Sequence, residues 1–174
     1  MKILAIRTDR IGDCILTLPA IRLIKKYYPE SEVYFMIKSK ISPLFYNNPD
    51  IKEIIPLSDK ASIREVFNKI KNYNFDISIN FFVDKITPIA VFLAKIPLRI
   101  GPFSKIQSIF LNRRIKQNRK KSIKHEADYN IELLSTLNIP FERVEPKIYI
   151  LEEEKNSFFR FSGKAEKENF VVIH

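Results

Sequence analysis

The chain has 174 residues with 45% hydrophobic, 29% charged and 12% aromatic side chains, a composition that excludes disordered, collagen-like and disulfide-scaffold proteins. Its three glycines stand at positions 12, 101 and 163, so neither a G-x-G-x-x-G dinucleotide motif nor a Walker-type phosphate loop can be written. The formal net charge of +10 favours polyanionic partners such as nucleic acid, anionic lipid or phosphorylated sugars.

Apolar residues follow strand-like and helix-like patterns in alternation. Short continuous apolar runs, such as residues 2–7, are typical of strands buried on both faces of a sheet. Apolar residues spaced by three and four, such as those from Leu16 to Tyr27, indicate helices. Pro19 falls in the first turns of that helix or kinks it, and Pro56 predicts an edge position for its strand. In chain order, the pattern predicts strands over 2–7, 33–37, 54–57, 76–82 and 98–101, helices over 16–28, 62–70, 86–95 and 127–137, a strand over 147–151, a helix over 152–162 and a strand over 170–174.

This alternation predicts the fold class and the domain boundaries. Strands that alternate with helices favour an α/β fold with a Rossmann-like, doubly wound, mostly parallel sheet. We expect residues 1–150 to form one domain and residues 151–169 to form a connection. The strand over 170–174 has the apolar character of a central strand and nothing follows it, so we expect it to be the first strand of a missing second domain.

The candidate site is the loop that follows the first strand, because doubly wound sheets bind ligands beyond the carboxyl ends of their strands. This loop contains Thr8, Arg10, Gly12 and Asp13. Gly12 allows a tight turn or the close approach of a ligand. Asp13 is open to two interpretations: a capping or first-turn acid that complements the helix dipole, or a functional carboxylate.

Residues 3–20, with the sequence ILAIRTDRIGDCILTLPA, resemble the N-terminal signature of the family 9 glycosyltransferases, the ADP-heptose:lipopolysaccharide heptosyltransferases. The specific part is the Gly-Asp pair at 12–13 followed by Thr-x-Pro-Ala at 17–20. The resemblance extends over essentially the whole chain, in order. Further matches lie at residues 73–80, 99–101 and 125–127.

The resemblance implies a GT-B fold, in which two Rossmann-like domains face each other across a cleft. This chain is then the N-terminal, acceptor-side domain, and the nucleotide-sugar donor is bound mainly by the missing domain. The implied reaction is inverting transfer of heptose from ADP-heptose to the lipopolysaccharide inner core. The family assigns the base that takes the proton from the acceptor hydroxyl to the Asp of the Gly-Asp pair, which is Asp13.

The other loop residues have less defined roles. Thr8 and Arg10 are candidates, with Gly12, for contacts to substrate through a phosphate or an acceptor carboxylate, and the alternative for Arg10 is a solvated loop cation. We expect no cofactor besides the donor. We also expect no metal ion, because the sequence has no D-x-D carboxylate pair and its two histidines lie far apart.

Residues 112–124 carry seven of the ten net positive charges and no acid. One interpretation is a solvated surface loop, and the other is attraction to the anionic inner-membrane leaflet or to a lipid-linked acceptor that bears phosphates and acidic sugars. Nucleic acid is a less favoured partner, because no recognition motif accompanies the charge. The cations are Arg113, Arg114, Lys116, Arg119, Lys120, Lys121 and Lys124.

Two further residues and the cellular location complete the expectations. His125 either faces the cleft or caps and packs the helix that begins there, and Cys14 is expected to be a small buried residue. One cysteine, no secretory signal and no long apolar span favour a cytoplasmic protein. The resemblance implies that the complete enzyme is cytoplasmic and peripheral to the inner membrane. The alternatives to an enzyme are a non-catalytic paralogue that binds an acidic glycolipid and a basic nucleic-acid-binding protein.

Overall fold

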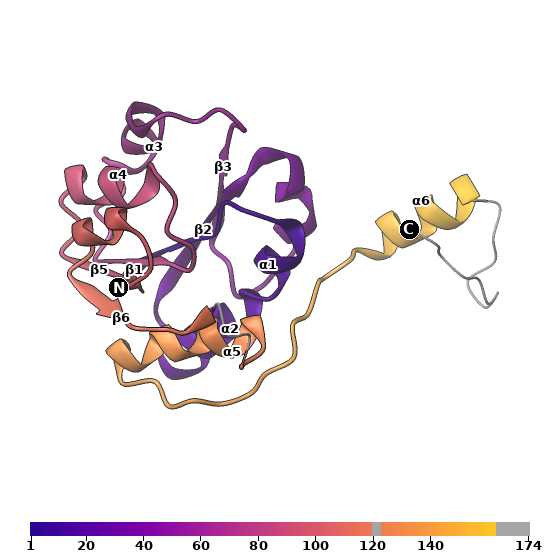
Figure 1. Cartoon of the computed structure of the whole chain (residues 1–174). Coiled ribbons are helices and arrows are strands. Elements are labelled where there is room, and N and C mark those ends of the chain that lie inside the picture. Colours follow the sequence, from indigo (N-terminus) through magenta and orange to yellow (C-terminus); the bar gives the residue numbers. More distant parts are fainter. Residues whose placement is uncertain (120–122, 163–174) are drawn as a thin grey trace.

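The computed structural model describes residues 1–119 and 123–162, and its centre is a six-stranded sheet (Figure 1). The strand order is β3-β2-β1-β4-β5-β6, and all five neighbouring pairs are parallel. This order is that of a Rossmann-like fold, so the predicted fold class is confirmed. The strands are β1 (Lys2–Ile6), β2 (Glu32–Lys38), β3 (Glu53–Leu57), β4 (Ile77–Asn80), β5 (Leu98–Pro102) and β6 (Arg113–Ile115).

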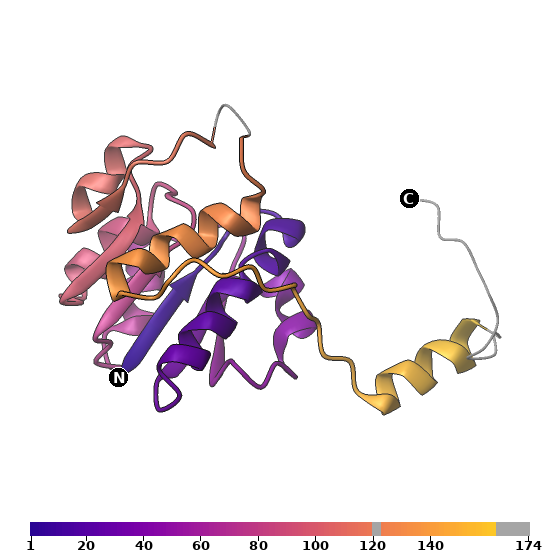
Figure 2. The same cartoon turned by 90° about the horizontal axis from the view of Figure 1, so that it is seen from below.

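Helices cover both faces of the sheet (Figure 2). One face packs against α2 and α5, and the other packs against α3 and α4. No helix in the described part of the chain is long and apolar enough to cross a bilayer. The α-helices are α1 (Ile11–Ile15), α2 (Leu18–Tyr27), α3 (Ile63–Ile70), α4 (Thr87–Leu93), α5 (Glu126–Glu132) and α6 (Glu152–Ser162), and the 3₁₀ helices are η1 (Ser39–Phe45), η2 (Ile106–Phe110) and η4 (Leu133–Leu137).

The two-sided core explains why the strands are continuous apolar runs. In β1, Ile3 and Ala5 belong to the cluster beneath α2, whereas Leu4 and Ile6 belong to the cluster beneath α3 and α4. All four side chains are fully buried. A strand with helices on both sides has no solvent face, so polar alternation is lost, as the sequence predicted.

The start of the first helical region differs from the prediction. Instead of one helix over 16–28, there are two, α1 and α2, separated at Leu16 and Thr17. Pro19 lies in the first turn of α2, where its missing N–H costs no hydrogen bond, so a new helix begins there rather than an old one bending. Gly12 and Asp13 therefore lie in a short helix and not in a loop.

The region after α5 contains a second correction. The strand predicted over 147–151 is not formed, because this segment runs along the helix layer, where no strand is available for pairing. Val144 and Ile148 pack against the core while their neighbours face outward, and this produces the strand-like alternation. The segment leads to α6, which forms as predicted and stands clear of the sheet and its covering helices (Figures 1 and 2). The predicted strand over 170–174 lies outside the described residues.

The predicted edge position of Pro56 is confirmed, and two helix ends have clear local causes. Pro56 lies in β3, an edge strand of the sheet. Ser62 caps α3, with its Oγ accepting a hydrogen bond from the Glu65 N–H at 3.1 Å. Helix η4 ends at Asn138, which adopts the left-handed conformation with φ 57°. By contrast, the edge strand β6 was not predicted, and it forms within the basic stretch.

Candidate functional site

The candidate site lies at the carboxyl edge of the sheet between β1 and β4, where the strand order reverses. Such reversal points are where ligands bind in doubly wound sheets. The Arg7 N–H donates to the Met36 carbonyl at 3.0 Å, and the Phe81 N–H donates to the Ile6 carbonyl at 3.0 Å. These bonds fix the chain leaving β1 against its neighbours on both sides and bring the first residues after β1 and β4 together.

Arg7 forms the floor of this site, and its side chain is 3% exposed. Its Nε and Nη2 donate to the two carboxylate oxygens of Asp9 at 2.6 and 2.9 Å. Its Nη1 donates to Glu126 at 2.9 Å, to the Asn130 side-chain oxygen at 3.2 Å and to the Phe81 carbonyl at 3.3 Å. Burial lowers the pKa of Arg7, but the hydrogen bonds and charges of Asp9 and Glu126 outweigh burial, so the pKa is raised overall. The guanidinium is therefore a permanent internal charge.

Asp13 is the carboxylate that Arg7 holds least closely. Its Oδ1 lies 3.4 Å from Nη2 of Arg7, and its side chain is 27% exposed. Within the described residues, its carboxylate has no other hydrogen bond or ion pair. Arg10, and not Asp13, is the N-cap residue of α1, so Asp13 is a first-turn acid whose carboxylate faces the buried guanidinium at the open side of the site.

Arg119 brings a second guanidinium to the cluster. Its Nη1 donates to Glu126, and its Nε donates to the Gln117 side-chain oxygen at 2.9 Å. Its Nη2 is enclosed and has no hydrogen-bond partner among the described residues. Burial lowers the pKa of Arg119. Two guanidinium groups, Arg7 and Arg119, thus face the three carboxylates of Asp9, Asp13 and Glu126, which leaves one negative charge in excess. We call these five residues the Arg7 cluster.

The structure places Thr8 in a connecting role. Its Oγ1 donates to Asp84 at 2.8 Å, and the other oxygen of Asp84 accepts from the N–H groups of Ile86 and Thr87 at 2.9 and 2.6 Å. Thr8 therefore joins the segment after β1 to the start of α4, and its hydroxyl proton is already engaged.

Gly12 and Arg10 are the exposed members of the predicted set. A Cβ added at Gly12 would meet no heavy atom within 4 Å, so no packing within the described chain requires a glycine there. Open space above a backbone next to Asp13 is compatible with the close approach of a ligand. Arg10 has no side-chain hydrogen bond or ion pair among the described residues.

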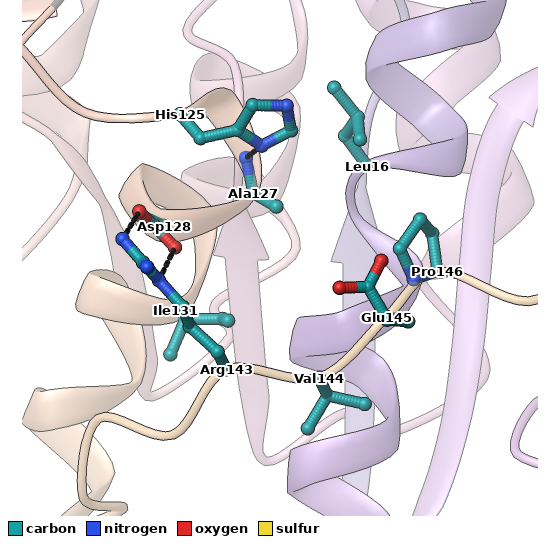
Figure 3. Close-up of a pocket in the computed structure, with 9 residues that line it drawn as sticks. All are labelled: Leu16, His125, Ala127, Asp128, Ile131, Arg143, Val144, Glu145 and Pro146. Carbon is teal, nitrogen blue, oxygen red and sulfur yellow. Dashed lines mark hydrogen bonds and ion pairs between the residues drawn. The ribbon is translucent and has the colours of Figure 1, made fainter.

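His125 has the capping role that was one of its two predicted interpretations. It is the N-cap residue of α5, with its Nδ1 accepting from the Ala127 N–H at 3.3 Å. Its ring also lines a cavity of about 480 Å³ between α5, Leu16 and residues 143–146 (Figure 3). On the wall of this cavity Asp128 accepts two hydrogen bonds from Arg143, at 3.0 and 3.3 Å. Helix α5 connects this cavity to Arg7, because it supplies Asp128 to the cavity wall and Glu126 and Asn130 to the Arg7 guanidinium.

The predicted basic stretch divides into cations of different character. Arg113, Arg114 and Lys116 are exposed, with the two arginines on β6. Arg119 pairs with Glu126 as described, and Lys124 pairs with Glu132 at 2.6 Å. Lys120 and Lys121 lie outside the described residues. The stretch is therefore more than a solvated loop: it contains an edge strand and one arginine of the candidate site.

Comparisons with known proteins identify the relatives of the chain. No family model matches it. It is 30% identical over 185 aligned positions to a Haemophilus influenzae protein named "Putative glycosyltransferase", covering 99% of this chain and 54% of that protein. It is also 30% identical over 79 positions to lipopolysaccharide heptosyltransferase 3 of Escherichia coli, covering 40% of this chain and 22% of that protein.

Two solved structures show the same fold. A family 9 glycosyl transferase from Veillonella parvula has a TM-score of 0.80 at 24% identity, with 94% of this chain and 50% of that chain covered. The E. coli ADP-heptose lipopolysaccharide heptosyltransferase II has a TM-score of 0.80 at 20% identity, with 96% and 52% covered. The resemblance to the family 9 glycosyltransferases is confirmed. The chain spans about half the length of the H. influenzae protein and of both solved structures.

Within this family 9 resemblance, sequence reasoning selected Asp13 but missed the groups that surround it. Arg7, Asp9 and Asn130 had no predicted role, and Glu126 was noted only as part of a matching motif. One available signal was the position of Arg7, a charge placed directly after a fully apolar strand at the edge where ligands bind. Its partners Glu126 and Asn130 are 119 and 123 residues away, so their contact could be found only in the fold.

Cys14 is not part of the chemistry. It is fully buried, and its Sγ donates to the Arg7 carbonyl at 3.4 Å. Burial raises the pKa of its thiol to about 12, so the nucleophilic thiolate is disfavoured. The predicted structural role of Cys14 is confirmed.

Proposed function

We propose that the chain is the acceptor-side part of an inverting glycosyltransferase and that Asp13 is its general base. One observation carries the assignment. Of the three carboxylates around Arg7, Asp9 and Glu126 are held by hydrogen bonds of 2.9 Å or less. Among the described residues, the Asp13 carboxylate has a single contact, at 3.4 Å, and it remains partly exposed. A base must be oriented and free to accept a proton, and Asp13 has this combination.

The proposed transfer needs no further catalytic group from this chain. The acceptor hydroxyl donates a hydrogen bond to Asp13 and attacks the anomeric carbon of the donor sugar. The bond between that carbon and the diphosphate oxygen breaks, and the nucleoside diphosphate leaves with the electron pair. The hydroxyl proton passes to Asp13, and Arg7 holds the carboxylate in place throughout. The position of the base, rather than its strength, then accounts for most of its contribution.

The proposed substrates are ADP-heptose as donor and the lipopolysaccharide inner core as acceptor. The names of the E. coli relatives support this choice. The exposed Arg10 also provides N–H donors of the type that bind phosphate or carboxylate groups of such an acceptor. Because the chain spans about half the length of these relatives, we propose that the donor is bound mainly by a second domain. We also propose that the complete enzyme acts on the cytoplasmic side of the inner membrane.

The base assignment is tested in a fusion that replaces the matching half of E. coli heptosyltransferase II with this chain. Transfer of heptose from ADP-heptose to a deacylated inner-core oligosaccharide is measured for wild type, Asp13→Asn and Asp76→Asn. Asp76 is a matched control, because it lies at the opposite edge of the sheet, where it accepts from the Lys2 N–H. We expect Asp13→Asn to lower kcat by about a hundredfold or more with little change in KM, and Asp76→Asn to leave both unchanged.

Binding to the 174-residue chain alone provides the second measurement. Calorimetric titration with the same oligosaccharide should give similar affinities for wild type and Asp13→Asn, because the variant keeps the site and removes only its basicity. Turnover by Asp13→Asn close to that of the wild-type fusion would refute the base assignment. Absence of oligosaccharide binding by the wild-type chain would refute the acceptor-side assignment.

A further inference from the structure

The positive charge of the chain is concentrated in one continuous segment. The 41 residues from Lys85 to His125 contain eleven Lys and Arg and neither Asp nor Glu, so the rest of the chain has a net charge of −1. The described part of this segment forms α4, β5, η2 and the edge strand β6. These elements lie together at one end of the sheet (Figure 1). The molecule therefore has one strongly basic end and a nearly neutral remainder.

Three of the large apolar side chains that are exposed at this basic end lie together around η2. Phe103 is 56% exposed, Ile106 is 82% exposed and Ile109 is 67% exposed. Together with Lys105 and Arg114 they line a shallow hollow of about 360 Å³. The Arg114 guanidinium lies 5.3 Å from the Phe103 ring centroid. We call these five residues the η2 face.

The cations of the η2 face are not neutralised by the part of the chain that the structure describes. No carboxylate of the described residues forms an ion pair with Lys105 or Arg114, in contrast to Arg119 and Lys124, which are both paired. Unpaired cations favour an anionic partner, and a cluster of exposed apolar side chains favours an apolar one. A single partner that satisfies both must be anionic at its surface and apolar just beneath it.

The η2 face is continuous with the candidate site through Phe82. The Lys105 ammonium lies 4.2 Å from the Phe82 ring centroid, and the Arg7 guanidinium carbon lies 5.9 Å from the same centroid. One aromatic ring therefore separates the η2 face from the cluster that holds Asp13. A partner bound at the η2 face lies next to the acceptor side of the site.

We propose that the η2 face docks on an anionic phospholipid bilayer. Phe103, Ile106 and Ile109 enter the headgroup region, and Lys105 and Arg114 meet the lipid phosphates. Nucleic acid would neutralise the cations but leave the isoleucines in water. A second copy would cover the isoleucines but bring like charges together. The proposal deepens the proposed function and rests on it in one respect: a lipid-linked acceptor in the same bilayer would reach Asp13 past Phe82.

The test is co-sedimentation of the 174-residue chain with vesicles of phosphatidylcholine, with and without phosphatidylglycerol. Two double variants remove the two components of the face separately: Lys105→Gln with Arg114→Gln, and Ile106→Ser with Ile109→Ser. The matched charge control is Arg22→Gln with Lys60→Gln, which removes two exposed cations elsewhere. The matched apolar control is Phe141→Ser with Ile150→Ser, which are 54% and 66% exposed.

We expect wild type to bind only the vesicles that contain phosphatidylglycerol. The charge variant should bind about thirtyfold more weakly, because each cation near an anionic leaflet contributes about a fivefold change in partitioning. The apolar variant should bind about tenfold more weakly. Both controls should bind like wild type, and circular dichroism should show that all variants are folded.

Several outcomes would overturn the proposal. These are equal losses in the control variants, binding to duplex DNA but not to vesicles, and self-association that Ile106→Ser with Ile109→Ser abolishes. Failure of the membrane proposal is distinguishable from failure of the proposed function. In the fusion enzyme, Ile106→Ser with Ile109→Ser should leave transfer to the deacylated, water-soluble acceptor unchanged and lower transfer only to acceptor presented on vesicles.

Discussion

The Arg7 cluster and the η2 face use the same residue types in opposite ways. Arg7 is buried, and the carboxylates of Asp9 and Glu126 hold it from two sides. Arg114 is exposed, stands beside a phenylalanine ring and has no carboxylate partner in the described chain. A charge whose partners are internal organises the protein, whereas a charge without internal partners is available to something outside it. Arg7 therefore positions groups within the candidate site, whereas Arg114 is available to bind a partner.

Removing the buried charge has the largest expected effect. In Arg7→Met, Asp9 and Glu126 lose the cation that compensates their partial burial, so we expect the free energy of unfolding to fall by about 3–5 kcal/mol. Arg114→Met, the exposed counterpart, should change it by less than about 0.5 kcal/mol. Urea denaturation followed by circular dichroism measures both. A similar effect in the two variants would remove the distinction between the regions.

Substitution of two glycines near these regions, Gly101 in β5 and Gly12 in α1, should also have different effects on stability. A Cβ at Gly101 would lie 2.6 Å from Leu111 Cδ1 and 2.9 Å from the Asn80 carbonyl oxygen, so Gly101→Ala should destabilise the fold by about 1–3 kcal/mol. Gly12→Ala creates no clash and lies in a helix, so it should be neutral or stabilise by about 0.5–1 kcal/mol. Thermal denaturation of both variants tests this. Loss of oligosaccharide binding by a stable Gly12→Ala would show that Gly12 serves the ligand and not the fold.

Much of this architecture could be predicted from the sequence, and the reasons for the exceptions are physical. Apolar runs such as 2–6 identify strands, because a strand that is buried on both faces of the sheet has apolar side chains at successive positions. Strand β6 escaped prediction because Arg113 and Arg114 pair through their backbones at an edge and bury little. The false strand at 147–151 arose because packing on a helix layer produces the same alternation as packing in a sheet. A local pattern reports which side chains are buried, and not what they are buried against.

The candidate site shows the same division. Asp13 could be selected from a short motif, because the Gly-Asp pair and the Thr-x-Pro-Ala that follows it lie within nine residues of one another. The role of Arg7 could not be selected in this way, since it depends on Glu126 and Arg119, which the fold brings from the far end of the chain. Helix α5 supplies both Glu126 and Asn130, so the last element of the sheet domain completes a site that begins at β1.

A third prediction concerns pH and Cys14, which packs directly behind Arg7. Burial raises the pKa of this thiol from its usual value to about 12 in the folded state. Between these values the unfolded chain loses the thiol proton while the folded chain keeps it, so stability falls as the pH rises. From pH 7 to about pH 10 the thiol should account for a loss of about 1–2 kcal/mol. Urea denaturation at each pH should show this component in wild type and not in Cys14→Ala, and its persistence in the variant would assign it to other groups.

The smallest expected effect on stability comes from salt, and it separates the two regions without any mutation. Raising the ionic strength from about 0.1 M to about 1 M shortens the Debye length from roughly 10 Å to roughly 3 Å. The ion pairs of Arg7 span 2.6 to 3.4 Å and are largely enclosed, so the free energy of unfolding should change by less than about 0.5 kcal/mol. The cations of the η2 face are exposed and therefore screened by salt, so vesicle binding should weaken steeply over the same range. Vesicle binding that is insensitive to salt would mean that Ile106 and Ile109 act alone, and a strong salt effect on unfolding would mean that the Arg7 cluster is open to solvent.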